Sequence, residues 1–396
     1  MKFSGLTERT AGDGVDAWQV HYDALARLEA GDDIILLSVG QETEERTPAH
    51  IVDAAIDSLR AGRHHYPPVS GNHDLRRAVA DYHFQRTGQR VSEANCAIFA
   101  GAQNALFAVA QCILEAGDEV ILSAPYYTTY PATFTASGAA LVSVPVKAKN
   151  QFQIDPGDII KAMTRRTRAV VLNSPNNPLG VVYSRERYAP IVRACVERGI
   201  WLIADDVYQE LLTEEELRER GSPTTLPGAG RVCVSVSSLS KSHRMTGWRI
   251  GWVVGPEELV RHLYHLAVCM SYGLPAFIQD AALAALAGGT ATAREIRRHL
   301  DRRRDLVLRQ LGGVPGLELF SAAGGMFVVF DISGMTAAVS ARRFARGLLE
   351  RHNVAILPCD GFGAAGARLL RVSLCVDEQR LEDACGRIAD YVDSLH

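Results

Sequence analysis

Between about residues 95 and 255, short continuous apolar runs alternate with longer amphipathic segments. Two of the amphipathic segments, 104–115 and 185–198, carry apolar side chains at helical spacing. Continuous apolar strands separated by helices predict a mainly parallel sheet that is covered by helices on both faces. The expected strands are 96–100, 119–123, 140–146, 169–173, 201–204, 232–236 and 250–254.

Length and charge exclude several classes of protein. A chain of 396 residues can bury a large core, and this length favours two or more domains. The net charge is only −3 with 22% charged residues, which indicates neither disorder nor a nucleic-acid-binding surface. The most basic run, 294–304, alternates with acidic and apolar residues and is interpreted as a solvated helix face. No apolar run approaches the ~18 residues of a membrane span, and the start lacks a signal-peptide core.

The eight cysteines are scattered, with no C-x-x-C pair among them. This spacing argues against a disulfide framework and against a zinc site, so no metal is expected. Free thiols are typical of a reducing compartment, and we therefore expect a cytoplasmic protein.

Polar residues follow four of the expected strands. In a parallel sheet ligands bind at the carboxyl ends of the strands, so these residues are candidate site residues. Gly101 opens a helix whose free N–H groups suit a phosphate. A rigid polar turn, S-P-N-N-P-L-G, begins at Ser174, and the sequence D-D-V-Y begins at Asp205. Lys241 follows the strand at 232–236 within S-S-L-S-K.

These four groups match the needs of pyridoxal phosphate. Hydroxyls near two cations, Lys241 and Arg249, form a natural cradle for a phosphate, and a buried amine can hold a carbonyl as a Schiff base. The pyridine ring acts as an electron sink when a carboxylate keeps its nitrogen protonated. An amide and a tyrosine can hold its phenolate oxygen. Burial near another cation lowers the pKa of a lysine, so that it can lose its proton and attack a carbonyl.

A series of motifs carries a family resemblance over essentially the whole chain. They are H-x-Y-P-x-V-x-G-x-x-x-L-R at 64–76, N-x-P-N-N-P-x-G at 173–180, D-x-V-Y at 205–208, and S-x-S-K at 238–241 with Arg249 eight residues on. In this combination the chain resembles the fold-type-I, pyridoxal-phosphate-dependent aminotransferases of class I/II. The resemblance implies a large domain, 50–285, with a mainly parallel seven-stranded sheet. It also implies a smaller α+β domain, 290–396, which the N-terminal segment 1–49 joins.

The resemblance also implies roles for the catalytic residues. Lys241 would form the internal aldimine with the cofactor and then move protons between the substrate Cα and the cofactor. Asp205 would pair with the pyridine nitrogen, while Asn177 and Tyr208 would hold the phenolate oxygen. Tyr127, in the sequence P-Y-Y, would stack on the cofactor ring.

Two further groups of residues are implied by the resemblance. Because the family works as a homodimer with shared active sites, one phosphate ligand would come from the neighbouring chain. The expected phosphate ligands are Ala102 and Gln103 through their N–H groups, Ser238, Arg249, and Tyr66 of the partner subunit. The expected contacts of the substrate α-carboxylate are Gly40, Asn177 and Arg371, an arginine that can bind it in a bidentate manner.

Two of these assignments have a neighbouring alternative. Asp206 can replace Asp205 as the ring partner, but in the family the acid precedes the tyrosine by three residues, which selects Asp205. Arg368 can replace Arg371, yet Arg371 begins the strand-like run R-V-S-L-C-V that the family motif requires.

The amino acid substrate is predicted from a narrower similarity. The segments 11–40, 238–256 and 269–282 resemble members of the family that take arginine as amino donor and pyruvate as 2-oxo acid acceptor. A long cationic donor needs an acidic partner for its guanidinium. The cluster Glu42, Glu44 and Glu45 follows Gly40 and is the expected partner.

Other functions remain open at this stage. A pyridoxal-phosphate-dependent C–S β-lyase shares nearly every motif, and an aminotransferase for aspartate, aromatic amino acids or alanine differs only in donor specificity. An effector-sensing domain of a transcription regulator carries an added helix-turn-helix domain. About 50 residues precede the large domain, which leaves no room for one.

Overall fold

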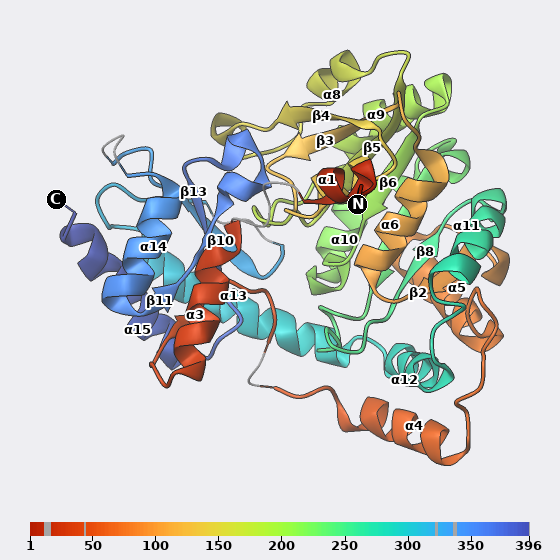
Figure 1. The fold of residues 1–396 in the computed structure, drawn as a ribbon, viewed down its shortest axis with the longest axis horizontal. Helices are drawn as coiled ribbons and strands as arrows, with labels where there is room; N and C mark the ends of the chain where they lie inside the picture. The colour runs from red at the N-terminus through yellow and green to blue at the C-terminus, as the bar shows by residue number, and fades with distance from the viewer. Residues whose placement is uncertain (12–16, 43–44, 321–323, 336–338, 396) are drawn as a thin grey trace.

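The computed structural model describes residues 1–11, 17–42, 45–320, 324–335 and 339–395. Figure 1 shows two lobes: a large one built on an extended sheet, and a smaller one in which the N-terminal and C-terminal parts of the chain lie together. Among the described residues, no helix is long and apolar enough to cross a membrane.

The large lobe contains the predicted sheet, which has seven strands within the described residues. In space their order is β2-β8-β7-β6-β5-β3-β4, and only β8 runs antiparallel to its neighbours. Each strand overlaps one of the seven predicted runs, so the prediction of a mainly parallel sheet is confirmed. The strands are β2 (Cys96–Phe99), β3 (Glu119–Ala124), β4 (Ala140–Pro145), β5 (Thr167–Asn173), β6 (Trp201–Asp205), β7 (Cys233–Ser238) and β8 (Gly251–Val254).

Both faces of this sheet are covered, which explains why its strands are apolar without alternation. Successive side chains of a strand point to opposite faces. Thus Leu172 of β5 packs in the apolar cluster that includes α8 and α9, whereas its neighbour Val171 packs in the cluster that includes α6 and α11. These helices are α6 (Ala102–Ile113), α8 (Pro156–Ala162), α9 (Arg185–Arg198) and α11 (Glu257–Met270).

Within the described residues, six further helices complete the large lobe. Helices α4 and α12 pack against each other at its lower edge in the view of Figure 1, and α5 packs on α12. Helix α1, near the N-terminus, contacts α7. The bounds are α1 (Gly5–Thr10), α4 (Ala49–Arg60), α5 (His73–Thr87), α7 (Tyr130–Thr135), α10 (Glu214–Arg220) and α12 (Ala276–Ala287).

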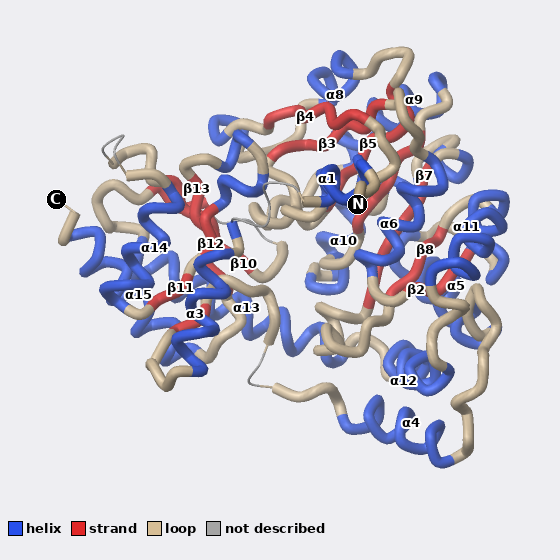
Figure 2. Tube along the Cα trace, in the orientation of Figure 1, coloured by secondary structure: helices blue, strands red, loops and turns tan. Residues whose placement is uncertain are grey.

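The small lobe has an antiparallel sheet in the order β12-β13-β10-β9, and β1 pairs in parallel with β11. Helix α3 lies beside the C-terminal helices in Figures 1 and 2. The elements are β1 (Ile35–Leu36), β9 (Glu318–Phe320), β10 (Phe327–Asp331), β11 (Val354–Ala355), β12 (Leu357–Pro358), β13 (Leu369–Ser373), α3 (Gln19–Glu29), α13 (Ala291–Leu311), α14 (Ala341–His352) and α15 (Glu378–Asp393).

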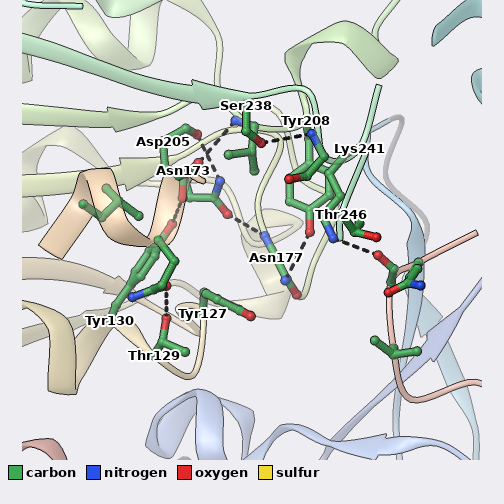
Figure 3. Close-up of a pocket in the computed structure, with 18 of the residues that line it drawn as sticks. Tyr127, Thr129, Tyr130, Asn173, Asn177, Asp205, Tyr208, Ser238, Lys241 and Thr246 are labelled. Carbon is green, nitrogen blue, oxygen red and sulfur yellow. Dashed lines mark hydrogen bonds between the residues drawn. The ribbon is translucent and has the colours of Figure 1, made fainter. Parts of the chain in front are cut away.

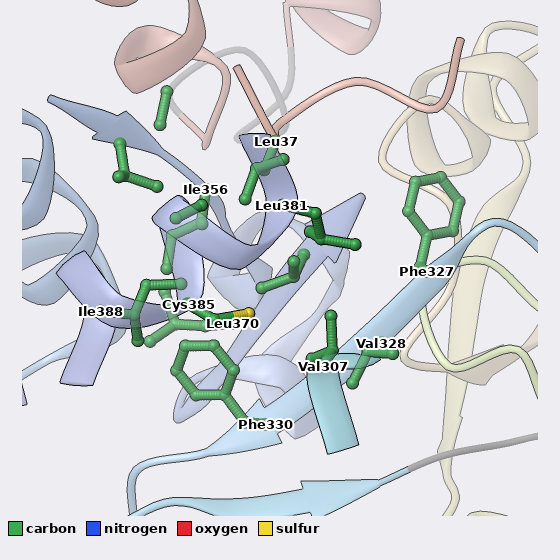
Figure 4. Packing of buried hydrophobic residues seen from close by; sticks show 14 of the residues in the cluster. Leu37, Val307, Phe327, Val328, Phe330, Ile356, Leu370, Leu381, Cys385 and Ile388 are labelled. Atoms are coloured by element: carbon green, nitrogen blue, oxygen red, sulfur yellow. The ribbon is translucent and has the colours of Figure 1, made fainter. Parts of the chain in front are cut away.

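One apolar cluster holds the small lobe together (Figure 4). It combines Leu37 from the N-terminal segment with Val307 of α13, Phe330 of β10 and Ile388 of α15, each fully buried. The predicted division puts 1–49 and 290–396 in one domain and 50–285 in the other, and it requires a core that the first two segments share. The domain boundaries themselves stay a prediction.

The fold brings the carboxyl ends of three strands together. Asn173, the last residue of β5, pairs in register with Asp205, the last residue of β6. Ser238 ends the next strand, β7. The predicted site residues therefore meet at one edge of the sheet, facing the small lobe.

Candidate active site

A cavity of about 370 Å³ lies at this edge of the sheet (Figure 3). Of the residues predicted to contact the cofactor or the substrate α-carboxylate, all but Tyr66 line it. The predicted residues that line it are Gly40, Ala102, Gln103, Tyr127, Asn177, Asp205, Tyr208, Ser238, Lys241, Arg249 and Arg371. The sequence therefore predicted these eleven residues of the cavity lining, while the role of each residue stays a prediction.

Lys241 extends its amine into the cavity, where Nζ donates a hydrogen bond to the carbonyl oxygen of Gly40 at 2.8 Å. Burial of the amine lowers its pKa from 10.5 to about 8, and the nearby guanidinium groups of Arg371 and Arg249 act in the same direction. A substantial fraction of the amine is thus neutral near physiological pH and can attack a carbonyl.

The lowered pKa has a consequence for stability in the cofactor-free protein. Below pH 8 the folded protein holds a buried charge that the unfolded chain solvates, at a cost of about 3 kcal/mol. Lys241→Met should therefore raise the melting temperature by a few degrees at pH 7. As the pH rises from about 8 to 10.5, the Lys241 amine of the folded wild type loses its proton before that of the unfolded chain does. The difference in melting temperature between the variant and the wild type should therefore disappear. Thermal denaturation of both proteins at pH 7 and at pH 10.5 measures this difference. An increase in melting temperature that is the same at both pH values would contradict a buried, titrating amine.

Asp205 presents a buried carboxylate at the end of β6. It accepts hydrogen bonds from the Tyr130 hydroxyl at 2.5 Å and from the Val207 N–H at 3.2 Å. Burial raises the pKa of Asp205 to about 6, although these hydrogen bonds oppose the shift. Among the described residues, no cationic side chain forms an ion pair with it. A protonated ring nitrogen in the cavity would supply the missing positive charge.

The neighbouring Asp206 does not line the cavity. Its carboxylate accepts hydrogen bonds from Ser235 at 2.5 Å and from the Gln209 amide at 2.7 Å. Successive residues at a strand end face opposite sides, so only Asp205 can face the ligand. The structure thus places the acid that the family spacing selects in the cavity.

Asn177 and Tyr208 are held as a pair next to Arg371. The amide oxygen of Asn177 accepts from Arg371 Nη1 at 2.8 Å, and its Nδ2 lies 3.4 Å from the Tyr208 hydroxyl oxygen. Because Tyr208 accepts this hydrogen bond, its own proton remains available to a ligand oxygen in the cavity. Burial raises the pKa of Tyr208 above its ordinary value, so the hydroxyl stays protonated.

Arg371 is a cation buried at 1% exposure in β13. Nη2 donates to the Ser38 carbonyl oxygen at 2.5 Å, and the guanidinium carbon lies 4.0 Å from the centre of the Phe327 ring. No carboxylate among the described residues pairs with it, and Nε has no hydrogen-bond partner there. The alternative Arg368 instead donates to backbone carbonyl groups, including those of Ile332 and Met335. Arg371 is therefore the arginine that can bind a substrate carboxylate.

The start of α6 and Arg249 form an anion-binding corner. Gly101 adopts φ +86° before the helix and leaves the first N–H groups without a side-chain cap. A Cβ at Gly101 would lie 2.5 Å from Arg249 Nη2, so the close approach requires glycine. Arg249 itself adopts φ 56° and donates to the Thr246 carbonyl oxygen at 2.7 Å. With the Ser238 hydroxyl nearby in the lining, these groups fit a phosphate.

The remaining predicted residues line the cavity wall. The Gln103 side chain is fixed by hydrogen bonds with Thr129 and Thr133, both 2.7 Å. The ring of Tyr127 stands edge-on to Tyr130, with 5.8 Å between centroids. A Cβ at Gly40 would lie 2.4 Å from Cζ of Phe327, so glycine is required there.

Tyr66 lies outside the cavity of its own chain. Tyr66 is 84% exposed, and its ring packs on that of Tyr272, at 5.1 Å between centroids. An exposed tyrosine in this position is available to a neighbouring chain. Its predicted contact with the phosphate of the partner's site stays a prediction.

The predicted role of Glu42 is wrong. Its carboxylate is buried between Arg244 at 3.2 Å and Arg303 at 2.9 Å and is already neutralised. Glu45 is exposed and lies outside the cavity lining, and Glu44 lies outside the described residues. The interpretation of 294–304 as a solvated face also fails at Arg303, whose side chain is 8% exposed because it pairs with Glu42.

Several residues of the site were missed. Tyr130 orients the Asp205 carboxylate, and the amide of Asn173 donates to the Asp205 carbonyl oxygen at 3.0 Å. Trp18 and Phe327 form walls of the cavity. Asn173 is the first residue of the recognised N-x-P-N-N-P-x-G motif and could have been found. The sequence carries no local signal for the other three, because their contacts join distant segments.

The comparisons with known proteins identify the family. The chain matches the family model for aminotransferases of class I and II over residues 32–388. Together with the α/β fold and the polar cavity, this match shows that the chain belongs to the class I and II aminotransferases and is an aminotransferase.

The similarity to individual relatives extends over nearly the full length of the chain. It is 47% identical to the arginine–pyruvate transaminase of Pseudomonas aeruginosa, over 98% of both chains. It is 34% identical to the aspartate/prephenate aminotransferase of Thermus thermophilus, over 93% of this chain and 94% of that protein. A solved structure of Thermus thermophilus aspartate aminotransferase with maleate superposes with a TM-score of 0.91 at 31% identity, covering 99% of this chain and all of the other.

Proposed function

We propose that this aminotransferase uses pyridoxal 5′-phosphate to transfer the amino group of L-arginine, or of another basic amino acid, to pyruvate. The proposal rests on the charged groups around one cavity. Within the part of the chain that the structure describes, the buried carboxylate of Asp205 has no ion-pair partner and the buried guanidinium of Arg371 has no carboxylate partner, and Lys241 has a lowered pKa. A cofactor with a ring cation, bound together with an anionic substrate carboxylate, satisfies these groups at once.

Different residues around the cavity would bind different parts of the cofactor. When bound, pyridoxal phosphate supplies an electron sink for the bonds at the substrate Cα. The N–H groups of Ala102 and Gln103, Ser238 and Arg249 would hold its phosphate. Asp205 would hold the ring nitrogen, and Asn177 and Tyr208 the phenolate oxygen. Tyr127 would pack on the ring face.

The chain itself supplies binding and proton transfer. Arg371 holds the substrate α-carboxylate through its guanidinium fork, with Asn177 beside it and the backbone of Gly40 closing the same end. Lys241, in its neutral form, would accept the proton from the substrate Cα and later donate it back. Tyr130 keeps the Asp205 carboxylate oriented toward the ring nitrogen.

The donor is proposed from the relative that is 47% identical, which is an arginine–pyruvate transaminase. The other functions considered, a C–S β-lyase or an aminotransferase for aspartate, aromatic amino acids or alanine, are not favoured. We also propose a cytoplasmic homodimer in which Tyr66 of the partner subunit reaches the phosphate. The exposure of Tyr66 and the absence of disulfides among the eight cysteines support this proposal.

A donor screen tests the proposed substrate. The purified enzyme, loaded with pyridoxal phosphate, is assayed with the twenty amino acids against pyruvate and against 2-oxoglutarate. Arginine with pyruvate should give the highest kcat/KM, followed by lysine or ornithine, with alanine and aspartate lower. Release of ammonia and pyruvate from a cysteine conjugate is measured in parallel. A preference for aspartate or an aromatic donor would overturn the arginine assignment, while faster β-elimination than transamination would favour the lyase.

A further inference from the structure

A second cavity of about 830 Å³ adjoins the catalytic cavity. We call it the distal cavity. The two share four lining residues, Trp18, Gln103, Tyr127 and Thr129. Because these side chains border both spaces, a substrate anchored in the catalytic cavity can extend its far end into the distal one.

The lining of the distal cavity is rich in aromatic side chains and, among the described residues, contains no lysine or arginine. Trp18, Tyr22 and Tyr126 contribute rings, and Asp360 contributes a carboxylate. His21 also borders the cavity, where burial and the charge of Arg371 lower its pKa, so that it stays neutral at pH 7. Asp360 is thus the ionised side chain of the described lining, and Arg342, from outside the lining, pairs with one of its oxygens. Aromatic faces beside a carboxylate oxygen that can still accept a hydrogen bond attract a cation.

The distal cavity lies close to the carboxylate anchor. The guanidinium carbon of Arg371 is 6.0 Å from the Trp18 ring centre and 5.4 Å from that of Phe362. Phe362 follows Asp360 by two residues, and its carbonyl oxygen accepts from the Tyr126 N–H at 3.0 Å. The loop that carries Asp360 is therefore fixed between the anchor and the cavity. The guanidinium carbon of arginine lies five bonds from its Cα, roughly 6 Å when extended, so the side chain of the donor reaches well beyond its anchored end.

We propose that the distal cavity binds the guanidinium of the amino donor, with Asp360 as its anionic acceptor and the rings of Trp18 and Tyr22 beside it. This proposal rests on the proposed function and names the residues that select its donor. It replaces Glu42, whose carboxylate is taken by two arginines. Asp360 Oδ2 accepts from Arg342 Nε at 2.9 Å and also lies 2.9 Å from Arg342 Nη2, whereas Oδ1 accepts from the Gly361 N–H at 3.0 Å. Oδ1 is therefore the oxygen that can accept a further hydrogen bond from the donor guanidinium.

Asp360→Asn is the central test, because it removes the charge and keeps the shape. In the loaded enzyme, kcat/KM for arginine should fall about 10- to 100-fold, whereas kcat/KM for alanine should change less than about twofold. Binding is measured separately from turnover with 5-guanidinopentanoate, which lacks the amino group, and with pentanoate. The variant should weaken inhibition by the guanidino acid by a similar factor and leave inhibition by pentanoate unchanged.

Two matched variants separate substrate binding from a structural role. Arg342→Gln breaks the same ion pair but keeps the Asp360 carboxylate, and it should retain the preference for arginine. Asp360→Glu keeps the charge and should restore part of the preference. Equal losses for arginine and alanine in Asp360→Asn, or a selective loss in Arg342→Gln, would overturn the role of Asp360.

The failure of this inference is distinguishable from failure of the proposed function. If the wild type transaminates arginine well and Asp360→Asn retains the full preference, only the distal cavity assignment is wrong. If the wild type does not use basic donors, the proposed donor itself is wrong. The preference of the wild type for 5-guanidinopentanoate over pentanoate then decides whether the distal cavity binds a guanidinium at all.

Discussion

Lys241→Ala should lower transamination of arginine by about 10⁴-fold or more, because it removes the amine that would hold the cofactor and that would act as the base at the substrate Cα. The lowered pKa and the position of Nζ in the cavity make this amine the candidate for both tasks. Single-turnover absorbance with arginine measures the rate. The phosphate ligands remain in the variant, so the loss should appear in the rate and not as a failure to fold.

Lys241→Arg provides the control for charge. A guanidinium stays protonated at every pH of the assay, so this variant should be as inactive as the alanine variant although it keeps the positive charge. Borohydride treatment of the loaded wild type should attach the cofactor to the peptide that contains Lys241, as judged by mass spectrometry. Near-normal turnover by either variant, or attachment at a different lysine, would contradict the assigned role.

The large sheet could be predicted because its strands are buried on both faces. Such strands appear in the sequence as continuous apolar runs, and all seven runs correspond to strands. The position of the site followed from the same pattern, because ligands bind where parallel strands end. Asn177, Asp205 and Lys241 were found in this way, since each lies in a local motif close to a strand end.

The errors concern contacts between segments that are far apart in the chain. Glu42 pairs with Arg244 and Arg303, which follow it by 202 and 261 residues. Nothing near Glu42 in the sequence distinguishes a buried ion pair from an exposed acidic loop. Nor does the sequence near Tyr130 indicate its hydrogen bond to Asp205, which lies 75 residues further along the chain. The distal cavity also joins distant segments, and the acidic residue in its lining, Asp360, is isolated in the sequence.

Arg371→Ala should lower kcat/KM for arginine by about 10²- to 10⁴-fold, because a bidentate contact with the α-carboxylate comprises two charged hydrogen bonds of about 1.5–3 kcal/mol each. The cofactor should remain bound, as its visible absorbance reports. Arg371→Lys keeps the charge but lacks the planar fork, so its loss should be smaller but still large. Loss of cofactor with unchanged arginine binding would contradict the assignment of this residue to the substrate.

The same variant tests how the two chains share a site. Tyr66→Phe removes the hydroxyl that would serve the partner's phosphate and should weaken cofactor retention about 10-fold or more. In a mixed dimer of an Arg371→Ala chain and a Tyr66→Phe chain, both defects fall on one site, if Tyr66 crosses to the neighbour. The other site then has an intact Arg371 and an intact Tyr66 of the partner subunit. Such dimers should therefore recover about half of the wild-type activity at limiting cofactor, whereas a Tyr66 that served its own chain would give two defective sites and no recovery.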